Sequence, residues 1–238
     1  MRDLRRRLSI VLVEPEGAIN FGFILRLIKN FGISSIYLIN PKFEVHGKDR
    51  DEICEFAARA CDLLDSDVIK FCSDLLSCLK LFDYSVCTTA KGFSEHDVLR
   101  QAININYLRN IIPSTGKIAL VFGRESVGLR RDELSLCDVV ATIDTGTDYP
   151  TMNLSHAIAV ILYVLLQGSY DENIVFASEA ESSRIRYVVN IIKELEDMLE
   201  VKDSSLALKH ILFRAKVTKT EISLLYKLFK KIKYAIKP

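Results

Sequence analysis

The sequence predicts an α/β protein, with a parallel sheet flanked by helices, followed by a small all-helical extension. Over the first two thirds of the 238-residue chain, short runs rich in Ile and Val alternate with amphipathic segments. Alternation of this kind is typical of strands joined by helical crossovers. After a polar stretch the remaining segments are all helical in pattern. The composition, 49% hydrophobic and 26% charged, is that of an ordinary globular protein.

Each predicted element follows from its local pattern. Short apolar runs predict strands over Leu8–Val13, Ser35–Ile39, Tyr84–Thr88, Lys117–Phe122 and Val139–Ile143. Apolar residues at helical spacing predict helices over Phe21–Phe31, Asp51–Leu64, Asp74–Leu81, Arg131–Leu136 and Leu154–Gln167. Asn20 stands directly before the first of these helices, where asparagine is a favoured N-cap.

The pattern breaks at the polar stretch that begins at Gly168. We therefore expect a domain over residues 1–168, a linker over 169–183 and a helical extension over 184–238. The extension holds three helix-like segments, Arg184–Leu199, Ser205–Arg214 and Lys219–Ile236. Before the last of them, Thr218 is followed three residues later by Glu221, as in a capping box.

Charge is divided unevenly between these parts. The net charge of the whole chain is +1, which alone argues against a nucleic-acid binder. Residues 184–238, however, carry thirteen Lys or Arg and six Asp or Glu, a balance of +7. Residues 1–183 carry nineteen and twenty-five, a balance of −6. A basic tail on an acidic body is compatible with binding to a polyanion.

Several classes of protein are disfavoured. No apolar run reaches the roughly 18–20 residues that a membrane span needs, and the basic start of the chain lacks the apolar stretch of a signal peptide. We therefore expect a cytoplasmic protein without membrane contact. The six cysteines include no C-x-x-C pair and no zinc-ligand spacing, so we interpret them as small buried residues, with disulfides left open. Dinucleotide-binding, P-loop and metalloprotease motifs are missing.

Three polar clusters each follow a predicted strand, where α/β proteins place ligands. The first runs from Asn20 through Gly22 to Arg26. A glycine early in a helix permits close backbone approach, and the arginine could hold a phosphate near a helix N-terminus. The alternative is a helix cap with a surface arginine in a salt bridge, and this segment alone favours that alternative.

The second cluster runs from Phe122 to Leu129 and carries the pair Arg124 and Glu125 between two glycines. It forms either a tight loop that accepts a flat ligand or a simple strand-to-helix turn with a solvated ion pair. The third, Asp148–His156, opens the apolar helix after the last strand. It is either a binding loop or only a helix start with several capping residues.

Taken together and in this order, the three clusters resemble the three motifs of the SPOUT superfamily of RNA methyltransferases. The first resembles the N-x-G-x-x-x-R pattern of its 2′-O-methylating branch. The second resembles its F-G-x-E-x-x-G-L pattern, and the third its helix start with an asparagine. Residues 8–167 follow this order and spacing.

The tail extends the resemblance. Residues 208–225 are similar to the C-terminal extension of the TrmJ family, whose members methylate the ribose 2′-hydroxyl of nucleotide 32 in the anticodon loop of tRNA. The stretches Glu14–Asn20 and Asn153–His156 resemble the archaeal members of that family.

This resemblance implies a SPOUT-type parallel sheet whose C-terminal part threads a trefoil knot, a rare exception to the rule that proteins are not knotted. It also implies that S-adenosyl-L-methionine binds in the knot and leaves as S-adenosyl-L-homocysteine, and that no metal is needed. By position, the cofactor-binding residues would be Thr88, Thr89, Ala90, Gly123, Ile143, Pro150, Thr151 and Met152.

Arg26 matches the arginine that the family assigns to activating the 2′-hydroxyl. A guanidinium group stays protonated, with a pKa above roughly 12, so it cannot serve as a literal base. We expect it to clamp a neighbouring phosphate and to favour the developing alkoxide. The side chains that would orient Arg26 and the ribose are those of Asn20, Glu125, Thr151 and Asn153.

The resemblance further implies tRNA as the partner and a homodimer formed through the knot region. The basic residues Arg5–Arg7 and the lysine-rich last helix would then contact phosphates. Two alternatives stay open. One is a SPOUT 2′-O-methyltransferase that acts on another tRNA position or on rRNA. The other is a non-catalytic RNA-binding protein that retains the knot.

Overall fold

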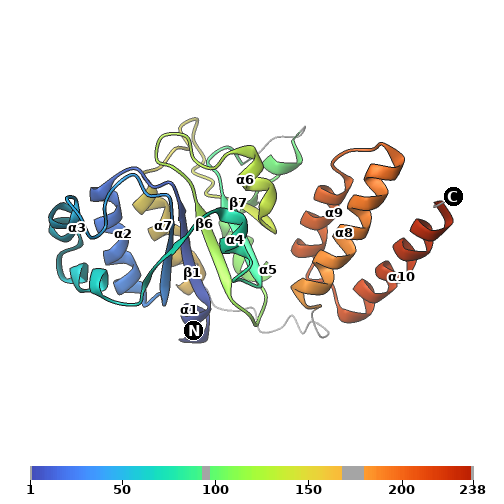
Figure 1. Cartoon of the computed structure of the whole chain (residues 1–238), viewed down its shortest axis with the longest axis horizontal. Coiled ribbons are helices and arrows are strands. Elements are labelled where there is room, and N and C mark those ends of the chain that lie inside the picture. Colours follow the sequence, from blue (N-terminus) through green and yellow to red (C-terminus); the bar gives the residue numbers. More distant parts are fainter. Residues whose placement is uncertain (1, 93–96, 168–179, 237–238) are drawn as a thin grey trace.

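The computed structural model describes residues 2–92, 97–167 and 180–236. Its centre is a sheet of seven strands in the order β3-β2-β1-β6-β4-β7-β5, in which all neighbours are parallel (Figure 1). The strands are β1 Leu8–Val13, β2 Ser35–Ile39, β3 Ile69–Cys72, β4 Tyr84–Thr88, β5 Ile103–Asn104, β6 Ile118–Phe122 and β7 Val139–Thr142. The predicted α/β class with a parallel sheet is confirmed.

Three of the five predicted strands have the predicted bounds, and the other two differ by one residue at one end. The sequence pattern missed β3 and β5. The strand β3 lies at the edge of the sheet and has no buried residue, so its sequence lacks an apolar run. The strand β5 has only two residues, too few to show a period.

The helices alternate with these strands. They are α1 Arg2–Arg7, α2 Ala18–Phe31, α3 Arg50–Ala57, α4 Leu75–Leu79, α5 Ile105–Ile111, α6 Arg131–Leu136 and α7 Leu154–Gln167, with 3₁₀ segments η1 Ala58–Asp65 and η2 Val98–Arg100. The extension adds α8 Ser182–Leu199, α9 Ser204–Arg214 and α10 Lys219–Ile236. The predicted helix over 51–64 divides into α3 and η1, because Ala58 takes a positive φ of 50°.

The prediction that Asn20 caps α2 is wrong. The helix begins at Ala18, after Gly17 in an extended conformation, so Asn20 lies inside the first turn. The predicted capping box of α10 is confirmed, since the Glu221 carboxylate accepts from the Thr218 amide at 2.7 Å and the Thr218 hydroxyl accepts from the Glu221 amide at 3.2 Å.

Period-two alternation along the strands builds a core on each face of the sheet. On β1, Ile10 and Leu12 face the layer formed by α2, α3, α5 and α7, whereas Val11 and Val13 face α4 and α6. All four are at most 3% exposed. The long helix α2 packs closely on α3 because Gly22 has no side chain. A Cβ atom there would lie 2.7 Å from the carbonyl oxygen of Ile53.

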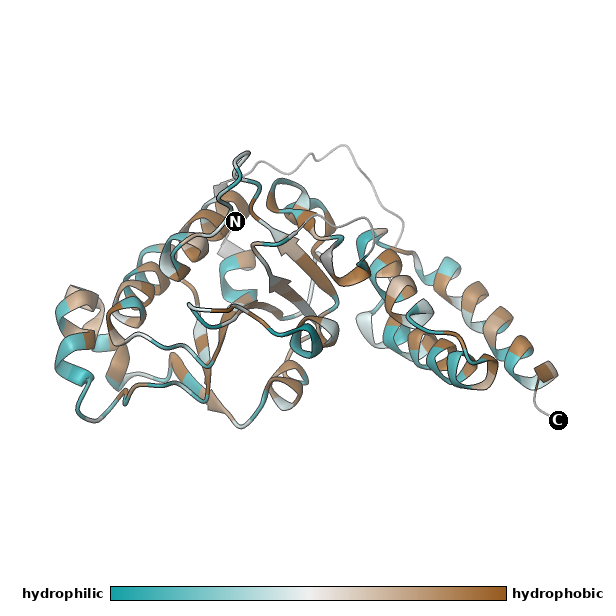
Figure 2. Ribbon diagram, turned by 90° about the horizontal axis from the view of Figure 1, so that it is seen from above, coloured by the Kyte–Doolittle hydropathy of each residue, from teal (hydrophilic) through white to brown (hydrophobic). Residues whose placement is uncertain are grey.

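The helical extension forms a lobe beside the sheet (Figures 1 and 2), and side-chain contacts join the two. Arg186 of α8 donates to the buried carboxylate of Asp138 at 2.6 Å. The ring of Phe213 in α9 packs against Tyr84 of β4, with the centroids 5.4 Å apart. Lys209 donates to the carbonyl of Ser135 at 2.6 Å. Most of the predicted linker 169–183 lies outside the described residues, and α8 begins at Ser182.

The interpretation of the cysteines as small buried residues holds for Cys78, Cys87 and Cys137, whereas Cys54, Cys61 and Cys72 are only partly buried. Disulfides, which the sequence left open, join four of the six. Cys54 forms a disulfide with Cys61, and Cys87 forms one with Cys137. Each pair comes from segments that the fold brings together, which spacing along the chain does not show. Within the described part of the chain, Cys72 and Cys78 are free. None of the described helices is both long and apolar enough to cross a membrane.

Candidate functional site

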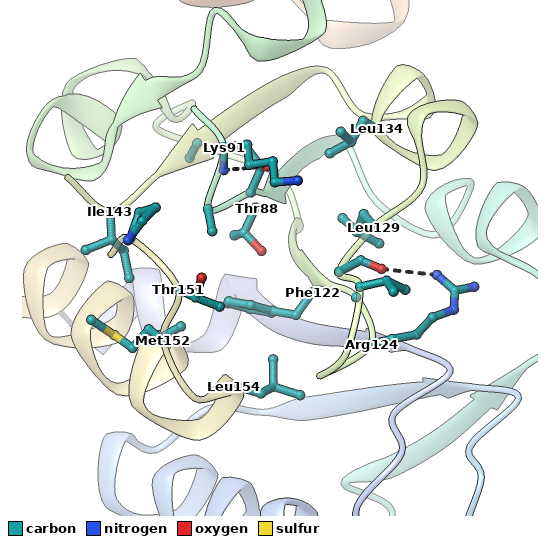
Figure 3. Close-up of a pocket in the computed structure, with 18 of the residues that line it drawn as sticks. Thr88, Lys91, Phe122, Arg124, Leu129, Leu134, Ile143, Thr151, Met152 and Leu154 are labelled. Atoms are coloured by element: carbon teal, nitrogen blue, oxygen red, sulfur yellow. Dashed lines mark hydrogen bonds between the residues drawn. The ribbon is translucent and has the colours of Figure 1, made fainter. Parts of the chain in front are cut away.

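A cavity of about 590 Å³ opens at the carboxyl ends of β4, β6 and β7. Its walls are the loops that follow these three strands, as expected for a ligand site in an α/β sheet. Figure 3 shows Thr88, Phe122 and Thr151 arranged around the hollow. All eight residues predicted to bind the cofactor line it, namely Thr88, Thr89, Ala90, Gly123, Ile143, Pro150, Thr151 and Met152.

The loop after β6 can pack tightly against itself because residue 123 is a glycine. Gly123 leaves β6 at a point where its loop folds back on itself. A Cβ atom there would lie 2.2 Å from the backbone carbon of Gly128 and 2.3 Å from the nitrogen of Leu129. Any side chain at residue 123 would therefore push the loop apart and change the wall of the cavity.

Sequence reasoning missed several residues of the lining. Asp97 forms an ion pair with Arg131 at the edge of the cavity, and Lys91 lies on the same side as Thr89. Leu134 adds apolar wall beside Leu129, the last residue of the second motif. Asp97 and Arg131 have no local signal, because they are 34 positions apart and meet only in the folded chain.

Glu125 joins the cavity to the start of α2. Its carboxylate accepts hydrogen bonds from the amides of Glu16 at 2.8 Å and Gly17 at 3.2 Å, and from the Asn20 side chain at 3.3 Å. In return, the Glu16 carboxylate accepts from the amide and hydroxyl of Ser126, at 3.0 and 2.7 Å. The two loops therefore hold each other in place.

A second link runs from Asn20 to the start of α7. The Asn153 amide donates to the Asn20 side-chain oxygen at 2.9 Å. The other end of the Asn153 side chain caps α7, where it accepts from the amide and hydroxyl of Ser155 at 2.9 and 2.7 Å. Asn20, Glu125 and Asn153 thus form one hydrogen-bonded chain that connects all three sequence motifs.

Of the two alternatives for the second cluster, the solvated ion pair between Arg124 and Glu125 is not the one formed. Arg124 is 8% exposed and instead binds Glu133 through two hydrogen bonds of 3.0 Å and Glu14 at 2.9 Å. Its hydrogen bond lowers the pKa of Glu14 to about 2, and Lys42 contributes to the same effect. This paired network fixes the loop that carries Glu125.

Arg26 lies apart from the cavity. It is exposed on α2, six residues beyond Asn20, which corresponds to about 9 Å along the helix axis. It makes no hydrogen bond or ion pair with another described residue, so its guanidinium group is available to a ligand. Of the five predicted catalytic residues, the structure joins Asn20, Glu125 and Asn153 directly, and Thr151 lies two residues before Asn153 on the cavity wall.

Comparison with known proteins agrees with this geometry. The model of the SpoU rRNA Methylase family matches residues 7–163. The chain belongs to this family. Within it, this SpoU-family methylase is 31% identical over 229 residues to the tRNA (cytidine-2′-O-)-methyltransferase TrmJ of Sulfolobus acidocaldarius, across 94% of this chain and 93% of the relative.

A second relative, the tRNA (cytidine-2′-O-)-methyltransferase TrmJ of Methanocaldococcus jannaschii, is 34% identical over 157 residues, which is 66% of each chain. The crystal structure of TrmJ from Z. mobilis ZM4 covers 94% of this methylase and 98% of its own length, with a TM-score of 0.66 and 17% identity. The predicted SPOUT fold class and the membership of the TrmJ group are confirmed. The trefoil knot stays a prediction.

The described residues contain no group of three or more His, Cys, Asp or Glu side chains that could hold a metal ion.

Proposed function

We propose that this methylase transfers a methyl group from S-adenosyl-L-methionine to the ribose 2′-hydroxyl of nucleotide 32 in tRNA. One observation carries the proposal: eight residues from three separate loops line a single cavity, and a hydrogen-bonded chain links that cavity to the helix of Arg26. The names of the Sulfolobus and Methanocaldococcus relatives support tRNA ribose as the substrate. The choice of nucleotide 32 rests on the resemblance of residues 208–225 to the C-terminal extension of the TrmJ family.

The cavity fits the cofactor in size and in lining. A volume of about 590 Å³ lies within the roughly 300–1,000 Å³ of small-molecule sites. Thr88, Thr89 and the loop backbone offer hydrogen-bond partners for a purine, and Ile143 and Met152 offer apolar contact with its faces. When bound, S-adenosyl-L-methionine supplies an activated methyl group.

The residues of the chain then have separate tasks. Arg26, which is exposed and positively charged, binds a phosphate next to the target ribose and favours negative charge on the 2′-oxygen. Because a guanidinium group keeps its proton, the hydroxyl proton leaves to phosphate or water. Glu125, Asn20 and Asn153 hold the starts of α2 and α7 in a fixed relation, so that the ribose is oriented toward Thr151.

A homodimer is part of this proposal. The exposed face of α2 carries Ile19, 40% exposed, and Phe23, 38% exposed, on the same stripe as Arg26. The neighbouring helix α7 adds Tyr163, 60% exposed. Exposed apolar side chains that gather on one face mark a surface that binds another protein, and we place a second copy of the chain on this one. Sedimentation velocity tests this part, and a Phe23→Asp variant should shift the methylase toward monomer.

Phosphate contacts complete the proposal. Arg6 and the exposed lysines of α10 would attract the tRNA backbone, which predicts that tRNA affinity falls steeply as salt is raised. The expectation that Arg7 contacts phosphate is not met, because its guanidinium group donates to the carbonyls of Pro113, Ser114 and Gly116.

The experiment is incubation of the full chain with cofactor labelled at the methyl group and either bulk tRNA or rRNA, followed by mapping of the methylated nucleotide. We expect label in tRNA at the 2′-oxygen of nucleotide 32. Label at another tRNA position or in rRNA would favour the first alternative, a different SPOUT 2′-O-methyltransferase. Failure to bind labelled cofactor would favour a non-catalytic RNA-binding protein.

A further inference from the structure

A second hollow lies in the helical extension, away from the methyl-transfer cavity. It has a volume of about 290 Å³ and lies between α8 and α10. Its floor is apolar, formed by Val188 and Ile222, each 1% exposed. Its rim is polar, formed by Ser183, Arg184 and Ser223.

Two aromatic rings form the walls of this groove. Tyr187 of α8 and Tyr226 of α10 pack against each other with their centroids 5.7 Å apart and their planes at 43°, so a ligand can stack against this pair but not between the two rings. Tyr187 is 57% exposed, although its ring is large and mostly apolar. An exposed ring beside an apolar floor presents a flat face on which another ring can stack.

Positive charge surrounds the same rings. The ammonium group of Lys230 lies 5.4 Å from the ring centroid of Tyr226. Arg184 stands at the rim, and its partner Glu181 is 4.0 Å away in an exposed pair that a phosphate can replace. The segment 184–238 as a whole carries a balance of +7. Cations next to exposed aromatic rings are the combination that binds single-stranded nucleic acid.

We infer that the groove lined by Tyr187 and Tyr226 binds one unstacked nucleobase of the RNA substrate against the outward side of this aromatic pair, with Arg184 and Lys230 on its flanking phosphates. The volume is just below the roughly 300 Å³ at which small-molecule sites begin, which suits one base rather than a whole cofactor. Figure 1 places α10 at the far end of the chain from α2, so within one subunit this base lies far from the ribose that Arg26 would contact. The inference rests on the proposed RNA substrate and adds a second point of contact with it.

The chain contains no tryptophan, which gives a clean test. A Tyr187→Trp variant of the full chain has a single indole at the wall of the groove. We expect its fluorescence to be quenched by a short oligouridylate, and not by an abasic oligoribophosphate of equal length and charge. If only phosphate groups were bound, both probes would quench the fluorescence equally, because they differ only in their bases.

Binding of tRNA provides the second measurement. Tyr226→Ala should weaken tRNA affinity about ten- to hundred-fold, the effect expected from loss of one base–aromatic stack. Tyr226→Phe keeps the ring and should bind nearly as the parent does, which separates stacking from damage to the fold. Tyr107→Ala, which removes a 65% exposed tyrosine from α5, is the matched control and should change nothing.

Each outcome decides the inference. Quenching by the base-bearing probe alone, with loss of tRNA affinity in Tyr226→Ala, supports it. Equal quenching by both probes overturns it, and so does unchanged tRNA affinity in Tyr226→Ala. If no methyl transfer to tRNA occurs but base-dependent quenching persists, the proposed function is contradicted, whereas nucleobase binding in the groove is still supported.

Discussion

Glu16 and Glu125 hold each other's loops. The backbone amide of Glu16 donates to the Glu125 carboxylate at 2.8 Å, and the Glu16 carboxylate accepts from the residue after Glu125, the Ser126 amide, at 3.0 Å. One loop begins the helix of Arg26 and the other forms a wall of the cavity. The arrangement therefore sets the position of the proposed RNA site relative to the cofactor site.

Replacing Glu125 with glutamine tests this arrangement. A Glu125→Gln side chain has one acceptor oxygen and one donor group, so at least one of the amides at residues 16 and 17 loses its partner. We expect kcat to fall by about a hundredfold, as small errors in positioning do. Steady-state kinetics and calorimetric cofactor binding measure the two effects separately. Glu181→Gln, at an exposed carboxylate of the extension, is the control, and a Glu125→Gln variant with the kcat of the parent would refute the positioning role.

Arg26 should be needed for transfer but not for cofactor binding. It is exposed and does not line the cavity, so Arg26→Ala should keep the melting temperature and the cofactor affinity of the parent. Transfer to tRNA should fall at least about a hundredfold, the loss typical when one electrostatic stabiliser of a transition state is removed.

Arg26→Lys should also be poor, because a point charge does not reproduce the planar fork. Lys29→Ala, on the next turn of α2, is the control. Appreciable transfer by Arg26→Ala would show that another group activates the hydroxyl.

His210 should make the docking of the extension sensitive to acid. Burial lowers its pKa from 6.5 to about 4, and the neighbouring charges of Lys209 and Arg214 act in the same direction. Between pH 6.5 and pH 4 the unfolded chain binds a proton at this residue that the folded chain does not. Stability is therefore full above pH 6.5 and is lost as the pH falls toward 4, by as much as about 3 kcal/mol.

His210→Gln removes this titration and keeps a side chain that can donate a hydrogen bond. Thermal unfolding followed by circular dichroism at pH 7 and pH 4.5 should show a larger drop in the parent than in the variant. Parallel drops in both proteins would assign the acid sensitivity to other groups.

The cysteines predict a definite thiol count. Two disulfides leave Cys72 and Cys78 free, so the denatured, unreduced chain should react with two equivalents of a thiol reagent, and with six after reduction. The bond between Cys87 and Cys137 closes a loop across 50 positions, worth about 4 kcal/mol by the chain-entropy model. Six thiols without reduction would show that neither bond forms.

The sequence predicted what local patterning controls. Buried strands such as β1 and β2 have continuous apolar runs, and their bounds could be read directly. The edge strand β3, with exposed residues such as Lys70 and Phe71, could not be read in this way. The eight residues predicted to bind the cofactor were identified by resemblance to a family and not by physical reasoning on single segments.

Contacts between distant segments lay beyond the sequence. The pairing of Arg124 with Glu14 joins residues 110 positions apart, so the sequence could not decide between a local pair with Glu125 and a ligand-binding loop. The partner of Asn20 was hidden for the same reason, since Asn153 is 133 positions away. Such contacts depend on which strands become neighbours, and only the folded sheet order reveals that.

The most direct test of the proposed function uses two tRNA transcripts that differ in one atom. One is unmodified, and the other carries a 2′-deoxyribose at nucleotide 32. With cofactor labelled at the methyl group, we predict stoichiometric label in the first transcript and none in the second. Equal label in both transcripts would contradict the proposal that the methylase acts on the 2′-hydroxyl of that nucleotide.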